Sequence, residues 1–242
     1  MKETKFFKWL DNLWYHYKWI ILTVFVFAIF IVVSIIQMAG REDIDMYIMY
    51  AGPEVITVQN GTYIEKAFEN LTPDDLTGDG KVSVSLRDLA ILSKEEMEER
   101  NEKMEAEEGQ TDGVANAIVV SHMSQNLQTF NQEILGGDSV ICLLSPYTYS
   151  IVREADGFMP ISEILGYTPE GLYDECGIYL AQTEFGRFTE GLYTLPEDTI
   201  LCIRRLSSMA FLKGTNKTER EHNYCVEKFK AAIEWKKPDY AA

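Results

Sequence analysis

An uncharged run of 20 residues near the amino terminus constrains this chain more than any other feature. Residues Trp19 to Met38 read WIILTVFVFAIFIVVSIIQM and contain no Asp, Glu, Lys or Arg. Because an α-helix rises about 1.5 Å per residue, such a run can cross a hydrocarbon core about 30 Å thick. The sequence therefore predicts a transmembrane helix at 19–38, with the lipid bilayer as its partner.

Charge is distributed unevenly around this run. Residues 1–18 carry a net charge of +2, whereas residues 41–242 carry −18. Because short Lys-rich flanks stay in the cytoplasm, we expect a single-pass protein of the cell membrane, with its amino terminus inside and an extracytoplasmic domain over 41–242. A cleaved signal peptide is the alternative. It would have a shorter apolar region and a small-residue cleavage site, for which Ser34 and Ala39-Gly40 are weak candidates.

The segment before the span is rich in aromatic residues. Within residues 1–18, Phe6, Leu10, Leu13 and Tyr17 recur at helical spacing, which places them on one helix face. We expect a cytoplasmic or interfacial amphipathic helix that contributes an aromatic belt at the inner membrane surface. A surface for a partner helix is the alternative interpretation.

The strongly acidic composition of residues 41–242 restricts the function classes. Nucleic acids are bound by stripes of Lys and Arg, so no nucleic-acid partner is expected. About 200 residues are enough to bury a core of one domain, and the excess negative charge favours solubility. A run from 93 to 113 is almost all charge and strong helix formers, so we expect it to be an exposed acidic insertion.

The hydrophobic pattern of 41–242 alternates between strand-like and helical periods, which predicts an α/β domain with a mainly parallel, mixed sheet. The run SVICLL at 139–144 is continuously apolar, as in strands covered by helices on both faces. The other expected strands lie at 44–52, 82–86, 117–120, 176–188 and 199–206. The expected helices lie at 62–71, 123–135, 147–157, 158–167 and 219–235.

The turn before the second strand imitates half of a calcium loop. Asp75, Thr77 and Asp79 have the spacing of the first ligands in an EF-hand, followed by Gly80. However, Leu86 stands at the twelfth position, where a bidentate acidic ligand is needed. We therefore prefer a solvated turn to a metal site.

The sequence shows none of the common catalytic motifs. The sequence contains no HExxH, GxSxG, Walker A or CxxC motif, and its three histidines are scattered. Cys142 and Cys202 lie in apolar runs, where we expect buried free thiols, with one disulfide among the four cysteines as the alternative. We expect no cofactor and no enzymatic activity.

The stretch from 128 to 163 resembles the bacterial extracellular solute-binding proteins of the periplasmic-binding type II-like fold. The resemblance rests on short motifs separated by a buried strand at 140–144, and they comprise Phe130, Glu133, Ile134, Gly137, Asp138, Gly157, Phe158, Met159, Pro160, Ile161 and Glu163. It implies one lobe of such a fold. The chain lacks a long second lobe and has Ser139 where Pro-Asp is usual, so the resemblance implies a short, membrane-tethered relative with a degenerate or missing cleft. The whole arrangement also resembles small membrane proteins of Gram-positive bacteria.

Open α/β sheets bind ligands beyond the carboxyl ends of their strands. That rule directs attention to Gly52 and Glu54 after the first expected strand, and to Ser145, Tyr147 and Tyr149 after the buried one. We expect a non-catalytic, membrane-anchored domain that binds a small solute or a membrane-protein partner. A structural or assembly subunit of a bacterial membrane complex is the alternative.

Overall fold

The chain forms two units, residues 1–43 and 44–242. The computed structural model describes residues 5–39, 44–106, 111–206 and 214–238. The first unit is one helix, α1 (Lys5–Ala39), which runs through both the aromatic segment and the apolar run. Within it, Tyr17–Ser34 has a mean hydropathy of 2.3 and is long and apolar enough to be a candidate membrane span.

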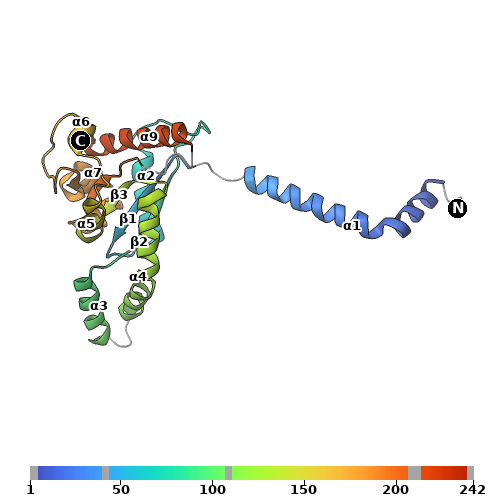
Figure 1. The fold of residues 1–242 in the computed structure, drawn as a ribbon, viewed down its shortest axis with the longest axis horizontal. Helices are drawn as coiled ribbons and strands as arrows, with labels where there is room; N and C mark the ends of the chain where they lie inside the picture. The colour runs from blue at the N-terminus through green and yellow to red at the C-terminus, as the bar shows by residue number, and fades with distance from the viewer. Residues whose placement is uncertain (1–4, 40–43, 107–110, 207–213, 239–242) are drawn as a thin grey trace. The chain divides into compact units, whose positions relative to one another are not determined.

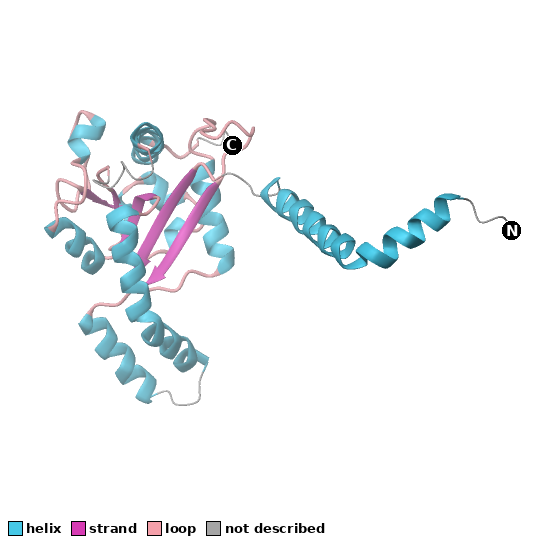
Figure 2. Ribbon diagram, turned by 45° about the vertical axis from the view of Figure 1, so that its right-hand side comes forward, coloured by secondary structure: helices cyan, strands magenta, loops and turns pink. Residues whose placement is uncertain are grey.

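The exposed apolar side chains of α1 indicate that this helix requires an apolar environment. Large apolar residues are exposed along its described length, and Trp19 and Phe30 are 73% and 68% exposed. A helix that is apolar on all sides is stable only in a protein core or a membrane. Figures 1 and 2 both draw α1 with a bend, which divides it into two helical stretches.

The second unit is an α/β domain built on a five-stranded mixed sheet. The strand order is β2-β1-β3-β5-β4. β1 is parallel to both β2 and β3, whereas β5 is antiparallel to β3 and to β4. The expected α/β class is therefore confirmed, with β5 as the strand of opposite direction. The strands are β1 (Met46–Gly52), β2 (Val84–Ala90), β3 (Ser139–Leu144), β4 (Gly177–Tyr179) and β5 (Ile200–Ile203).

Helices cover both faces of this sheet, as Figures 1 and 2 show. Alternate residues of β1 enter two separate core clusters: Ile48 packs with Phe68 and Phe229, and Met49 packs with Phe130 and the residues around it. The described helices are α2 (Val58–Glu69), α3 (Lys94–Ala106), α4 (Thr111–Gly136), α5 (Pro146–Glu154), α6 (Ile161–Leu165), α7 (Glu184–Phe188) and α9 (Thr215–Glu234). Two 3₁₀ turns, Leu180–Gln182 and Leu192–Thr194, lie around α7.

Two expected strands are corrected by the structure. Residues 117–120 belong to the long helix α4, because their apolar run continues the helical segment that follows it. Of 176–188, only β4 is a strand; the chain then turns into Leu180–Gln182 and α7. The Thr183 hydroxyl oxygen accepts a hydrogen bond from the backbone N–H of Gly186 at 2.9 Å, so Thr183 caps a helix instead of continuing a strand.

The described part of the acidic run is mostly helical, and the cysteines are buried free thiols, as expected. Most of the insertion is helical, in α3 and the start of α4, and Met97 of α3 packs against a small cluster formed by Ala90 and Leu92. The four cysteines are free and buried. Burial raises the pKa of the Cys225 thiol to about 12, which makes that thiol unreactive at neutral pH.

Candidate functional site

The carboxyl ends of the parallel strands meet at one edge of the sheet, and β5 begins at that same edge. Gly52 pairs with Ala90, Leu144 pairs with Ile200, and Ile200 pairs with Tyr179. The loops that follow β1, β3 and β4, and the loop that precedes β5, therefore emerge together. We call this the carboxyl edge. It is where open α/β sheets place their ligands.

Gly52 and Glu54 lie over a buried tyrosine. A Cβ atom on Gly52 would come 2.6 Å from the Tyr50 hydroxyl oxygen, so only glycine fits against this ring. The backbone N–H of Glu54 donates to that hydroxyl at 3.3 Å. Burial raises the pKa of Tyr50, and the nearby carboxylates of Glu54, Asp88 and Asp198 raise it further. Tyr50 is thus a neutral phenol beneath an acidic edge.

Asp88 adds a perturbed carboxyl group to this edge. Its Oδ2 accepts a hydrogen bond from the backbone N–H of Ile56 at 3.2 Å. Burial raises the pKa of Asp88 to about 6, although the side chain stays partly open to solvent. The hydrogen bond from Ile56 opposes this rise. The group therefore helps to position the loop after Gly52, and its pKa is about 6.

The predicted residues after β3 have structural partners. The Ser145 backbone N–H donates to the Ala51 carbonyl at 2.9 Å, and its hydroxyl oxygen accepts the N–H of Thr148 at 3.3 Å, which caps α5. Tyr147 is half-buried against the core. Tyr149 is 1% exposed, and its hydroxyl donates to Asp174 Oδ1 at 2.6 Å. Tyr149 is therefore packed in the core.

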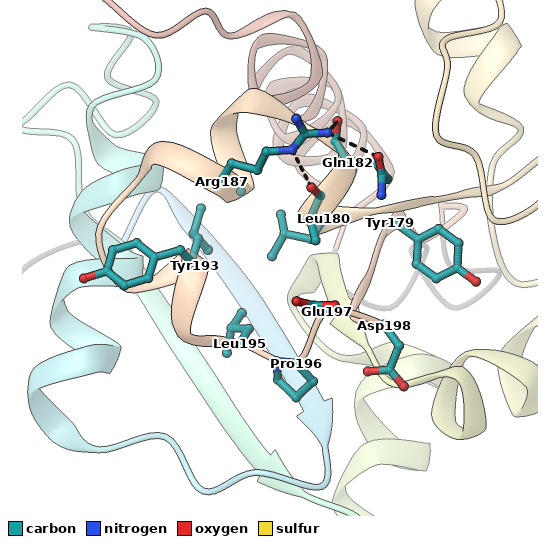
Figure 3. A pocket seen from close by; sticks show the side chains of 12 residues that line it. Tyr179, Leu180, Gln182, Arg187, Tyr193, Leu195, Pro196, Glu197 and Asp198 are labelled. Carbon is teal, nitrogen blue, oxygen red and sulfur yellow. Dashed lines mark hydrogen bonds between the residues drawn. The ribbon is translucent and has the colours of Figure 1, made fainter.

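A cleft of about 610 Å³ opens beside these loops, within the size range of small-molecule sites. Figure 3 shows its side chains. Tyr179 ends β4, and Glu197 and Asp198 come just before β5, so the cleft lies at the carboxyl edge. The lining residues are Tyr179, Leu180, Ala181, Gln182, Gly186, Arg187, Leu192, Tyr193, Leu195, Pro196, Glu197 and Asp198.

The walls of the cleft are held by short-range contacts. The Thr183 hydroxyl donates to the Leu180 carbonyl at 2.7 Å. A Cβ atom on Gly186 would come 2.1 Å from that same carbonyl oxygen, so the close approach of α7 requires glycine. Gly191, with φ of +85°, packs against Tyr63 and Ile64 of α2. The cleft is therefore built on fixed backbone.

The turn with the calcium-like spacing uses its carboxylates internally. Asp75 Oδ1 accepts the backbone N–H of Gly78 at 2.6 Å, and Asp75 Oδ2 accepts that of Gly80 at 2.7 Å. These hydrogen bonds hold the pKa of Asp75 below its usual value. Asp79 Oδ1 accepts the N–H of Lys81, and Thr77 donates its hydroxyl to Asp75. The geometry is that of a self-capped turn.

The sequence interpretation selected the loops after β1 and β3, whereas the cleft is lined by residues between 179 and 198, which that interpretation did not select. Residues 179–198 form an irregular connection between two short strands, whereas the sequence interpretation assigned 176–188 to a strand and only 190–198 to a connection. The Gly and Pro residues of EGLYTLPED (190–198) indicated a connection between strands but gave no sign of a cleft. No protein-family model, no curated protein and no solved structure matches the chain.

Proposed function

We propose that this chain is a membrane-anchored, extracytoplasmic binding domain whose site is the cleft at the carboxyl edge. The observation that carries the proposal is the position of the cleft: its lining runs from the end of β4 to the loop before β5, at the carboxyl edge where α/β sheets receive ligands. Its lining residues include aromatic, apolar and charged side chains, the mixture typical of a ligand site.

Binding without catalysis fits the chemistry of the lining. Within the part of the chain that the structure describes, the cleft lining includes no Ser, Cys, His or Lys, which are frequent nucleophiles and general bases. The carboxylates of Glu197 and Asp198 are exposed and suited to pairing with a ligand cation.

The membrane anchor and its orientation complete the proposal. α1 supplies a candidate span over Tyr17–Ser34, and the Lys-rich flank before it favours a cytoplasmic amino terminus. Residues 44–242 then lie outside, where the excess negative charge of the domain favours solubility. The extracytoplasmic side is also where solutes are captured.

A relationship to one lobe of the solute-binding proteins is part of this proposal. The residues that carry the resemblance have consistent structural roles: Phe130 is fully buried, and Glu133 accepts hydrogen bonds from the Arg87 and Ser139 side chains. Phe158 stacks on Tyr149 with ring centroids 4.9 Å apart. These contacts support a packed core around the residues that carry the resemblance.

The test uses the full chain in lipid nanodiscs and a thermal-shift screen against sugars, peptides and organic cations. A ligand at 100 times its Kd adds about 2.7 kcal/mol to the free energy of unfolding, which raises Tm measurably. We expect one class to raise Tm, and Tyr193→Ala to abolish the shift. Tyr167→Ala is the matched control, because Tyr167 is also about half exposed and does not line the cleft. The absence of a shift with any class would contradict ligand binding.

A structural or assembly role is the second candidate, favoured by the exposed aromatic side chains of α1. Trp14, Tyr15 and Trp19 are 57%, 75% and 73% exposed, and rings of this kind are enriched at both membrane and protein interfaces. Crosslinking in membranes discriminates between the candidates. If residues 1–38 are replaced by an unrelated anchor and the crosslinked partners are lost, the assembly role is supported; unchanged partners oppose it.

A further inference from the structure

The charged groups of the cleft lie on opposite sides of it. Figure 3 shows Arg187 on one side and Glu197 with Asp198 on the other, with the side chain of Leu180 between them. Arg187 belongs to α7, whereas the two acidic residues belong to the loop before β5. The cleft therefore offers a cation and two carboxylates at separate ends.

Arg187 is held in place without using all of its donors. Its Nε donates to the Ala181 carbonyl at 2.7 Å, and its Nη2 donates to the Gln182 backbone and side-chain oxygens at 3.3 and 3.2 Å. Among the described residues, Nη1 has no hydrogen-bond partner. A guanidinium fixed in this way is preorganised to bind a carboxylate.

The opposite end is suited to a cation. Glu197 and Asp198 are exposed, and within the described ranges their side-chain oxygens accept no hydrogen bond. In Figure 3 the Tyr179 ring points away from Leu180 and Arg187, and it packs edge-on with Tyr173 at 5.4 Å between ring centroids, so the two carboxylates form this end of the cleft. The middle of the cleft is apolar, with Leu180, Leu192, Leu195 and Pro196.

We infer that the cleft binds short, zwitterionic peptides with apolar side chains. The ligand carboxylate pairs with Arg187, the ligand ammonium pairs with Glu197 and Asp198, and the apolar side chains contact the leucines between them. This inference rests on the proposed function and names its ligand class. An anion alone would meet the repulsion of two carboxylates, and an uncharged sugar would leave both charged ends unpaired.

The experiment measures binding of three probes to the full chain in nanodiscs by calorimetry: trileucine, N-acetyl-trileucine and trileucine amide. We expect trileucine to bind most tightly. Removing the ammonium by acetylation, or the carboxylate by amidation, should each weaken binding on the order of tenfold, because each change deletes one charge-assisted contact.

Variants assign each end of the peptide to its partner. Arg187→Gln should bind trileucine and its amide equally while still discriminating against the acetylated probe. The double variant E197Q/D198N should bind trileucine and N-acetyl-trileucine equally while still discriminating against trileucine amide. Glu190→Gln is the matched control, since Glu190 is exposed nearby but does not line the cleft. Because the readout is a ratio between probes, a general loss of affinity in one variant does not imitate the expected pattern.

The two proposals fail in different ways. If trileucine does not bind but another ligand class shifts Tm through Tyr193, the peptide inference is overturned and the binding function stands. If trileucine binds but its two blocked forms bind equally well, the assignment of the charged ends is overturned. If no ligand of any class binds, both proposals fail.

Discussion

At the residue scale, two helical glycines differ in whether the surrounding structure has room for a side chain. Gly186 approaches the Leu180 carbonyl so closely that a methyl group would clash, whereas a Cβ atom on Gly61, inside α2, would lie at an ordinary van der Waals distance of 3.7 Å from the Leu86 side chain. The same substitution should therefore act in opposite directions at the two positions.

We predict that Gly186→Ala lowers the free energy of unfolding by about 1–3 kcal/mol, since α7 must move away from Leu180. Gly61→Ala should raise it by about 0.5–1 kcal/mol, because alanine favours a helix interior. Chemical denaturation of the full chain in detergent measures both. A destabilised G61A, or an unchanged G186A, would contradict the packing described here.

Asp88 makes stability depend on pH. Its pKa in the folded protein is about 6, whereas an unperturbed Asp titrates near pH 3.9. Between these values the folded protein holds the proton more tightly than the unfolded chain does. The contribution of Asp88 to the free energy of unfolding is therefore fully present below about pH 3.9 and is lost as the pH rises through 6.

We predict that Asp88→Asn removes the pH-dependent contribution of Asp88 to the free energy of unfolding. The variant should be at least as stable as the wild type at pH 8. Asparagine keeps an acceptor for the Ile56 N–H while removing the charge. The gain should stay below about 1 kcal/mol, because the carboxylate is partly exposed and its charge is screened. Tm measured from pH 4 to 8, with Glu98→Gln on α3 as a control, tests this. A wild-type slope retained in the Asn variant would refute the assignment.

At the element scale, the edge strand β2 is closed by side chains of neighbouring helices. Glu65 and Glu69 of α2 accept the backbone N–H groups of Leu86 at 2.8 Å and Val84 at 3.2 Å. Asn126 of α4 donates to the Ala90 carbonyl at 2.9 Å. Unpaired edge groups of this kind would otherwise be available to strands of other molecules.

We predict that the double variant E65A/E69A loses about 1–2 kcal/mol of stability and self-associates through β2. Analytical ultracentrifugation of the full chain in detergent should show a concentration-dependent shift. E95A/E99A is the control, since it removes the same charge from exposed positions of α3. Equal association of both variants would mean that lost charge, not an opened strand edge, is the cause.

The sequence predicts elements best where apolar patterns are long or sharply bounded. The bounds of β3 match the expected 139–144, because its apolar run ends at Pro146, which opens α5. The strand expected at 176–188 fails after Tyr179, because a Thr cap and a close glycine contact redirect the chain. The cleft could not be predicted, since its two charged ends come together only through the packing of that irregular connection.

At the scale of the whole molecule, the candidate span Tyr17–Ser34 and the proposed outer position of residues 44–242 make a prediction about membrane topology. All four cysteines are buried, so a membrane-impermeant maleimide should label the native protein poorly. A single exposed thiol then reports topology with little background. Ser150 is exposed on α5, and Asn12 lies before the candidate span.

We predict that the impermeant maleimide labels Ser150→Cys in intact cells, whereas it labels Asn12→Cys only after the membrane is permeabilised. The reason is the +2 charge of residues 1–18, because positively charged flanks of membrane spans favour the cytoplasmic side. The reverse pattern would place the domain inside and remove the basis for extracytoplasmic ligand capture. Labelling of S150C in the culture medium, free of membranes, would instead show that the apolar run is a cleaved signal peptide. Only labelling of S150C on intact cells in the membrane fraction supports the anchored binding domain, because that result places the carboxyl-edge cleft where an external peptide can reach it.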